Sequence, residues 1–84
     1  MNKKHRKTLD AIKTKPTIAN IRFADIEKLL IALGAEKIEG RGSRVGFVMP
    51  DGFKWEAHRP HPQKEARKYQ VDSLRDFLEL LNYE

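Results

Sequence analysis

The sequence predicts a small α+β domain in which two helices flank a three-stranded antiparallel sheet. A helical apolar pattern begins at Phe23, a strand-type alternation runs from Val45 to Ala57, and a second helical pattern begins at Val71. The chain has 84 residues, which suits a single domain over 1–84. In the simplest packing for this order, both helices cover the same face of the sheet.

Both helices are predicted from apolar side chains that recur every three or four residues. The first is expected over residues 23–33, where Asp25 lies in the first turn and Gly34 provides a typical C-terminal stop. The second is expected over residues 70–82. Its apolar stripe comprises Val71, Leu74, Phe77, Leu78 and Leu81.

The strand segment spans residues 35–57, with turns at 40–42 and 50–52. A three-residue loop, Pro50-Asp51-Gly52, gives a register that places every apolar residue of this hairpin on one face. The expected inner-face pairs are Met49 with Phe53, Phe47 with Trp55, and Val45 with Ala57. The same register places Arg44 opposite His58 on the outer face, together with Lys54 and Glu56.

The N-terminal residues 1–20 form a basic extension to the body over 21–84. Residues 1–15 hold six basic side chains against Asp10, whereas the remaining 69 residues are neutral. Residues 2–14 allow a short helix with Leu9 and Ile12 on one face. Two interpretations stay open: an arm attracted to a polyanion, or a solvated, frayed terminus.

Several classes of protein are disfavoured by composition. The absence of cysteine removes disulfides and thiolate metal sites, and it fits a reducing cytosol. The longest apolar run, residues 29–33, is far shorter than the ~20 residues of a membrane span. His58 and His61 have a spacing that zinc could use, but only Glu56 or Glu65 could add a third ligand, so we predict no metal and no cofactor.

The segment from Arg41 to Lys68 is the strongest candidate for a nucleic-acid site. It holds seven basic residues against three acidic ones, and phosphate backbones favour such clusters through counterion release. The alternative is an ordinary solvated loop. DNA is the weaker target because the last helix is not basic. Phe47 and Trp55 alternate with the inner set, so we assign them to the core rather than to base stacking.

The order and spacing of several segments resemble the HicA family of bacterial toxins over nearly the whole chain. The segments are Phe23 to Leu30, Gly42-Ser43 with Val45-Gly46-Phe47, Pro50-Asp51-Gly52, His61 to Glu65, and Ser73 to Leu78. The resemblance implies a fold like that of double-stranded-RNA-binding domains. It also implies a ribosome-independent, metal-independent mRNA endonuclease of the bacterial cytoplasm, which arrests translation and is neutralised by a HicB-like antitoxin.

One position departs from the family pattern. The family's catalytic histidine follows Gly-Ser, and this chain has Arg44 there. Arginine stays protonated and cannot act as a general base, but it can bind phosphate. Our hypothesis is therefore that His58 performs the acid–base chemistry and Arg44 binds the scissile phosphate. The expected RNA-binding residues are Ser43, Arg41, Lys54, Arg59, His61 and Lys64. The alternative is a non-catalytic module that binds RNA or only its antitoxin.

Overall fold

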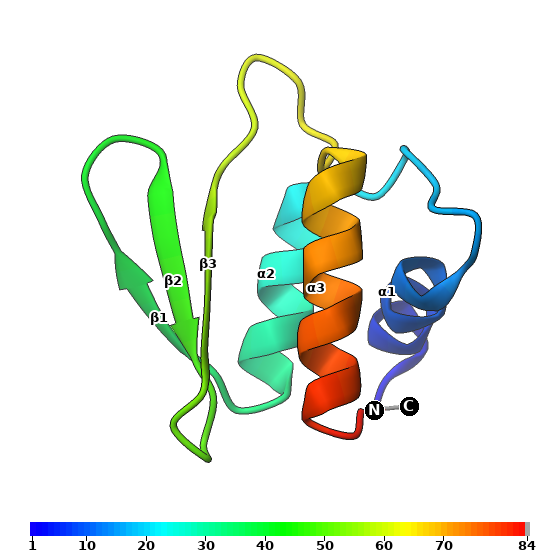
Figure 1. Ribbon diagram of the computed structural model, residues 1–84, viewed down its shortest axis with the longest axis horizontal. Helices are drawn as coiled ribbons and strands as arrows, with labels where there is room; N and C mark the ends of the chain where they lie inside the picture. Colours follow the sequence, from blue (N-terminus) through cyan, green and yellow to red (C-terminus); the bar gives the residue numbers. More distant parts are fainter. Residues whose placement is uncertain (84) are drawn as a thin grey trace.

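The structure is a computed structural model that describes residues 1–83. It has three helices and three strands in the order α1, α2, β1, β2, β3, α3 (Figure 1). Their bounds are α1 Lys3–Lys13, α2 Phe23–Ala32, β1 Glu36–Glu39, β2 Arg44–Val48, β3 Lys54–His58 and α3 Lys68–Leu80. The predicted α+β order of helix, three-stranded meander and helix is therefore confirmed, and it is that of a double-stranded-RNA-binding-like fold.

The sheet is antiparallel with strand order β1-β2-β3, and its predicted register is correct. Val45 pairs with Ala57 and Phe47 with Trp55, and the Met49 N–H donates to the Phe53 carbonyl at 2.8 Å next to the turn. Gly52 closes the turn with a φ of 93°, a conformation that favours glycine. The three-residue turn thus directs one apolar face of the hairpin toward the helices.

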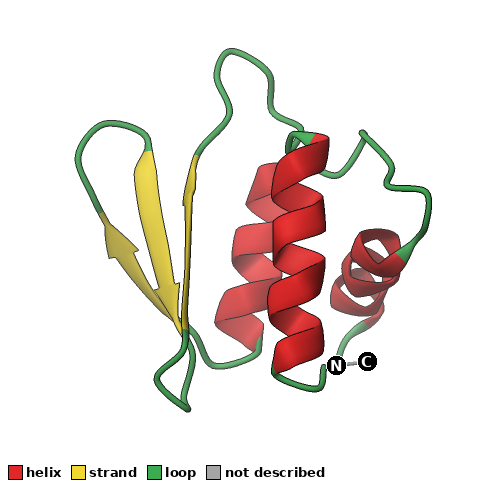
Figure 2. Cartoon of the chain, viewed as in Figure 1, coloured by secondary structure: helices red, strands yellow, loops and turns green. Residues whose placement is uncertain are grey.

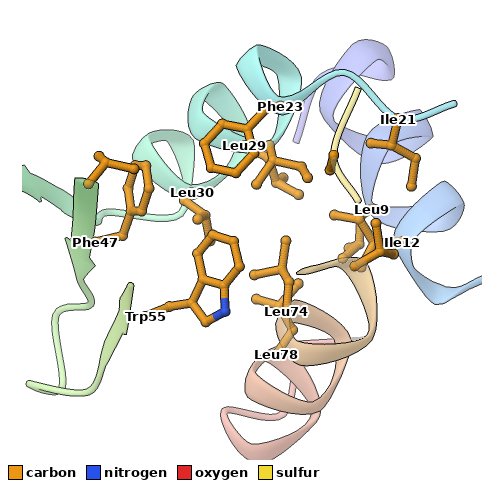
Figure 3. Close-up of a cluster of buried hydrophobic side chains, with 14 of the residues drawn as sticks. Leu9, Ile12, Ile21, Phe23, Leu29, Leu30, Phe47, Trp55, Leu74 and Leu78 are labelled. Atoms are coloured by element: carbon orange, nitrogen blue, oxygen red, sulfur yellow. The ribbon is translucent and has the colours of Figure 1, made fainter. Parts of the chain in front are cut away.

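The molecule has three layers, with the sheet on one side, α2 and α3 in the middle, and α1 on the far side of the helix pair (Figures 1 and 2). The core is continuous through these layers (Figure 3). Trp55 lies between the sheet and α2, with its ring centroid 6.2 Å from that of Phe47 and 6.3 Å from that of Phe23. Its assignment to the core rather than to base stacking is confirmed by an exposure of 5%.

The N-terminal segment is not frayed over Lys3–Lys13, contrary to one of the two open interpretations. Leu9 and Ile12 are buried against α2 and α3. The buried Arg75 of α3 ties this helix down, because its guanidinium donates to the Ile12 carbonyl at 2.9 Å and to the Thr14 carbonyl at 3.1 Å. The short helix expected from two apolar residues is therefore an integral third layer.

The exposure of Phe53 is the second difference from the prediction. The alternation predicts this residue on the inner face, but it is 51% exposed, whereas Met49 opposite it is buried. The turn between β2 and β3 extends beyond the ends of α2 and α3 (Figure 1), and Phe53 belongs to this connecting segment, just before β3 begins at Lys54. The helix boundaries differ from prediction by only one or two residues, and α2 ends before Gly34, whose φ is 100°.

Candidate nucleic-acid interface

The open face of the sheet, away from α2 and α3, carries Arg44 and His58 side by side. Arg44 is the first residue of β2, His58 is the last residue of β3, and the register places them directly opposite each other. Both are exposed. Cross-strand neighbours have Cβ atoms about 5 Å apart. A guanidinium and an imidazole can therefore reach one ligand on this face.

Ser43 and Gln70 hold His58 from two sides. Nδ1 of His58 lies 3.2 Å from the hydroxyl oxygen of Ser43. The Arg59 N–H donates to the Ser43 carbonyl at 2.8 Å, which extends the strand pairing and fixes Ser43 beside the ring. The buried Gln70 of α3 donates through Nε2 to the His58 carbonyl at 2.8 Å. The ring nitrogen Nε2 of His58 makes no hydrogen bond within residues 1–83, so it is available to a ligand.

Two further cations, Lys54 and Arg41, lie on or beside this face. Lys54 approaches Glu56 at 3.4 Å, and Arg44 approaches the same carboxylate oxygen at 3.9 Å. Exposed ion pairs of this kind contribute only about 0–1 kcal/mol to stability, so Lys54 and Arg44 can each exchange Glu56 for a phosphate. Arg41 is exposed in the β1–β2 turn, where its carbonyl accepts the Arg44 N–H at 3.1 Å.

Two glycines let these side chains lie against the backbone. A Cβ at Gly46 would lie 2.8 Å from Cε of Lys54, and a Cβ at Gly40 would lie 2.9 Å from Cβ of Arg44. Real Cβ atoms essentially never lie this close to a neighbouring atom, so a larger residue at Gly46 would displace the Lys54 side chain, and one at Gly40 would shift the backbone at Arg44. The positions of both cations therefore depend on glycine at these two places.

Arg59 has a different environment from the one expected of an RNA-binding residue. Its guanidinium donates to both carboxylate oxygens of Glu39 at 2.7 and 2.9 Å, and to both of Glu27 at 2.9 and 3.1 Å. These bonds raise the pKa of Arg59 further above its ordinary value, with Glu39 the larger cause. The Arg59 hydrogen bond in turn lowers the pKa of Glu39. Arg59 thus joins the end of β3 to β1 and α2, and we leave it out of the RNA-binding surface.

His61 and Lys64 lie apart from the Arg44–His58 pair in their immediate contacts. Both are exposed in the β3–α3 loop and line a hollow of about 460 Å³ with Arg22 and Phe23 at the start of α2. The Lys64 carbonyl accepts the Phe23 N–H at 3.0 Å, which fixes the loop over that helix end. The structure therefore groups these two residues with α2 rather than with the outer face of the sheet.

Tyr69 was missed by the sequence reasoning. It lies in the first turn of α3, is 65% exposed, and lines a hollow of about 170 Å³ together with His58 and Ser73. The sequence feature that could have identified it is that Tyr69, an aromatic residue, lies outside the apolar stripe of the last helix.

Over residues 1–83, no group of three His, Cys, Asp or Glu side chains is placed to hold a metal ion. Within the same residues, every helix is too short or too polar to cross a membrane.

Comparison with known proteins identifies a family. The family model described as HicA toxin of bacterial toxin–antitoxin matches residues 23–80, which span α2 to α3. No curated protein and no solved structure gives a significant match to the chain. The matched range includes Ser43, Arg44 and His58 and leaves α1 outside.

Proposed function

The chain belongs to the HicA family of toxins from bacterial toxin–antitoxin systems, and we propose that it is an endoribonuclease that cleaves mRNA and so arrests translation in the bacterial cytoplasm. The observation that carries the proposal is the exposed Arg44–His58 pair, with the Ser43 hydroxyl 3.2 Å from Nδ1 of His58. This pair combines an imidazole, which can take up and release a proton, with a guanidinium, which is a permanent phosphate ligand.

The proposed reaction is attack of a ribose 2′-oxygen on the adjacent phosphorus. His58 takes the 2′-hydroxyl proton through Nε2 as the O2′–P bond forms. Arg44 donates to the non-bridging phosphate oxygens, whose negative charge increases in the phosphorane. The P–O5′ bond then breaks, and the 5′-oxygen takes a proton from solvent. The products are a 2′,3′-cyclic phosphate and a 5′-hydroxyl end, and the reaction needs no metal.

Ser43 has a positioning role in this scheme. When Nδ1–H donates to the Ser43 oxygen, Nε2 keeps its lone pair, which is the form that a general base requires. Gln70 fixes the backbone of the same residue. In this scheme the contact with Ser43 leaves Nε2 of His58 as the nitrogen that faces the RNA.

The remaining cations are proposed to hold the flanking phosphates. Lys54 and Arg41 lie on either side of Arg44 along the hairpin and its turn. His61 and Lys64 would meet RNA only where it passes the end of the sheet toward α2, because that is where their hollow lies. We therefore assign Arg41 and Lys54 to the central contacts and His61 and Lys64 to peripheral ones.

We propose that a HicB-like antitoxin neutralises the toxin by covering the Arg44 face with acidic groups. Arg44 and Lys54 compete for Glu56 at distances of 3.9 and 3.4 Å, so an acidic partner surface could take the place of phosphate there. Charge reversal by Arg44→Glu should weaken the complex strongly, whereas Lys64→Glu, beside α2, should weaken it less. An unchanged dissociation constant in Arg44→Glu would contradict this mode of neutralisation.

A non-catalytic role is the second candidate, and Arg44 is the observation that favours it. The family's histidine is replaced here by a residue that cannot act as a base. Such a protein would bind RNA, or only its antitoxin, through the same face. Growth after induced expression separates the candidates, since an active nuclease arrests growth and a binding module with retained RNA affinity does not.

The decisive experiment is cleavage of a defined RNA by purified variants without antitoxin. His58→Ala should lower the rate by about 10²–10⁴-fold, the usual contribution of a general base. Arg44→Ala should also abolish most activity, and products of the parent should carry 2′,3′-cyclic phosphate ends. A substrate with 2′-deoxy at the cleaved nucleotide should be inert.

Lys28→Ala is the matched control, because Lys28 is an exposed cation on α2, away from the open face of the sheet. It should retain parental activity. Full activity in His58→Ala would remove the mechanism. RNA binding without any cleavage by the parent would establish the non-catalytic alternative.

A further inference from the structure

A hollow of about 170 Å³ lies between the free edge of β3 and the first turns of α3, directly beside His58. Ligand pockets for drug-sized molecules occupy about 300–1,000 Å³. This hollow therefore suits a smaller group. Its position next to the Arg44–His58 pair means that a nucleotide bound there would have its phosphate within reach of that pair.

Tyr69 forms an exposed aromatic wall of the hollow. It is 65% exposed, whereas Phe23, Phe47 and Trp55 are all buried. An exposed aromatic ring beside a basic, phosphate-binding face is the arrangement on which single-stranded nucleic acids stack their bases. The backbone of Tyr69 is fixed in the first turn of a 13-residue helix, so stacking would require ordering of the side chain alone.

The free edge of β3 offers polar groups to the rim of a base. In an antiparallel ladder, alternate residues direct their backbone groups toward the partner strand. The bonds from Met49 to Phe53 and from Arg59 to Ser43 show that the odd-numbered residues of β3 face β2. The N–H and carbonyl of Glu56 therefore point to the free edge. The Ser73 hydroxyl accepts the Trp55 Nε1–H at 3.1 Å and keeps its own hydrogen to donate.

We propose that this hollow binds the nucleobase adjoining the scissile phosphate, with Tyr69 stacked on its face and the Glu56 backbone and Ser73 hydroxyl at its edge. The inference rests on the proposed RNA-cleaving function and adds a base-selective subsite to it. A strand of a partner protein could also pair with the free edge of β3, but such pairing would use backbone groups and would not require an aromatic ring at position 69.

The test is equilibrium binding of the full chain to short 2′-O-methyl RNA oligonucleotides, which cannot be cleaved, measured by fluorescence anisotropy. One position at a time is made abasic. In the parent, a single abasic position should weaken binding by about tenfold, within the range of one lost base stack. Tyr69→Ala should weaken binding to the intact oligonucleotide similarly, and the abasic penalty at that position should then disappear. Tyr69→Phe should keep both properties.

Phe53→Ala is the matched control, because Phe53 is an aromatic residue of similar exposure at the opposite end of β3. It should show the parental abasic penalty. Parental affinity in Tyr69→Ala, with binding still lost in Arg44→Ala, would overturn the subsite and leave the proposed function intact. Failure of the parent chain to bind any RNA would overturn both.

Discussion

The hydroxyl of Ser43 lies 3.2 Å from Nδ1 of His58 and joins the start of the β2–β3 hairpin to its last residue. Ser43 precedes β2 and His58 ends β3, so the contact forms only when the hairpin has its native register. Orientation of the imidazole is therefore coupled to the pairing of the two strands. The contact also distinguishes the Ser43 hydroxyl, which would act through His58, from Arg44, which would contact the phosphate.

Removal of this hydroxyl should slow RNA cleavage without preventing it. We expect Ser43→Ala to lower the cleavage rate constant about fivefold, which corresponds to loss of one ordinary hydrogen bond of ~1 kcal/mol. Ser43→Thr keeps a hydroxyl and should retain most of the activity. The measurement is the single-turnover rate constant for cleavage by Ser43→Ala, Ser43→Thr and the parent. Identical rate constants for Ser43→Ala and the parent would show that the contact has no role in orienting His58.

Arg59 should contribute to stability rather than to RNA affinity. Its guanidinium makes four hydrogen bonds to Glu27 and Glu39, and the Glu27 side chain is only 14% exposed. Arg59→Ala would leave that carboxylate partly buried without its main partner. We expect the free energy of unfolding in urea to fall by about 1–3 kcal/mol, the cost of losing hydrogen bonds to a charged group.

Arg41→Ala supplies the comparison for Arg59, because Arg41 is an exposed turn residue. It should change stability by less than about 0.5 kcal/mol but should weaken RNA binding. Arg59→Ala should show the reverse pattern when affinity is measured on fully folded protein. Equal effects of the two substitutions on stability, or a larger loss of RNA affinity in Arg59→Ala, would contradict this assignment.

Acid should destabilise the fold through Glu39 and Asp72. Hydrogen bonding from Arg59 lowers the pKa of Glu39, and hydrogen bonding from Thr17 lowers that of Asp72. A carboxylate whose pKa is lower in the folded state stabilises the fold above its ordinary pKa, and this contribution is lost as the pH falls through the lowered value. The ordinary values are 4.5 and 3.8. The urea midpoint should therefore begin to fall below about pH 4.5.

Glu39→Gln makes that pH prediction specific. The variant should be less stable than the parent at neutral pH, and the difference should shrink as the pH falls below 4.5, because the parent's carboxylate then becomes protonated as well. Glu36→Gln, on the same strand and also exposed, should follow the parent at every pH. A pH-independent difference between Glu39→Gln and the parent would show that Arg59 does not hold Glu39 in its charged form.

The hairpin register was predictable because only one alignment of residues 44–58 places the apolar side chains on a common face. That alignment also predicts that Arg44 lies opposite His58, and the observed pairs agree with it. The predicted pairing of Phe53 with Met49 is confirmed, but the 51% exposure of Phe53 was not predictable, because alternation gives the face of a residue and not whether that face is covered.

The ionic network around Arg59 could not be predicted from a count of charges. Glu27 and Glu39 lie 32 and 20 residues away in the sequence, and only the packing of β1 and α2 at the end of β3 brings them to one guanidinium. The same limit applies to Tyr69, whose place beside His58 depends on how α3 packs along the edge of β3. Local patterns defined the elements and the hairpin, whereas contacts between distant elements required the structure.

The N-terminal helix α1 should be part of the folding unit even though the family match begins after it, at residue 23. Ile12 is 0% exposed and Leu9 is 1% exposed, and the buried Arg75 donates to the Ile12 carbonyl at 2.9 Å. Ile12→Ala should therefore lower the free energy of unfolding by about 2–5 kcal/mol, the range for truncating a buried aliphatic side chain.

Lys13→Ala tests the alternative that α1 is only a basic arm, since Lys13 is the exposed neighbour of Ile12. It should change stability by no more than about 0.5 kcal/mol. Deletion of residues 1–13 should have a larger effect than Ile12→Ala, because it also leaves the Arg75 guanidinium without the Ile12 carbonyl as an acceptor. If Ile12→Ala were as mild as Lys13→Ala, α1 would be separable from the body, and its basic residues could act as a mobile arm. A large, Ile12-specific loss instead means that this layer helps to hold α2 and α3, the helices on which the sheet and its Arg44–His58 face are supported.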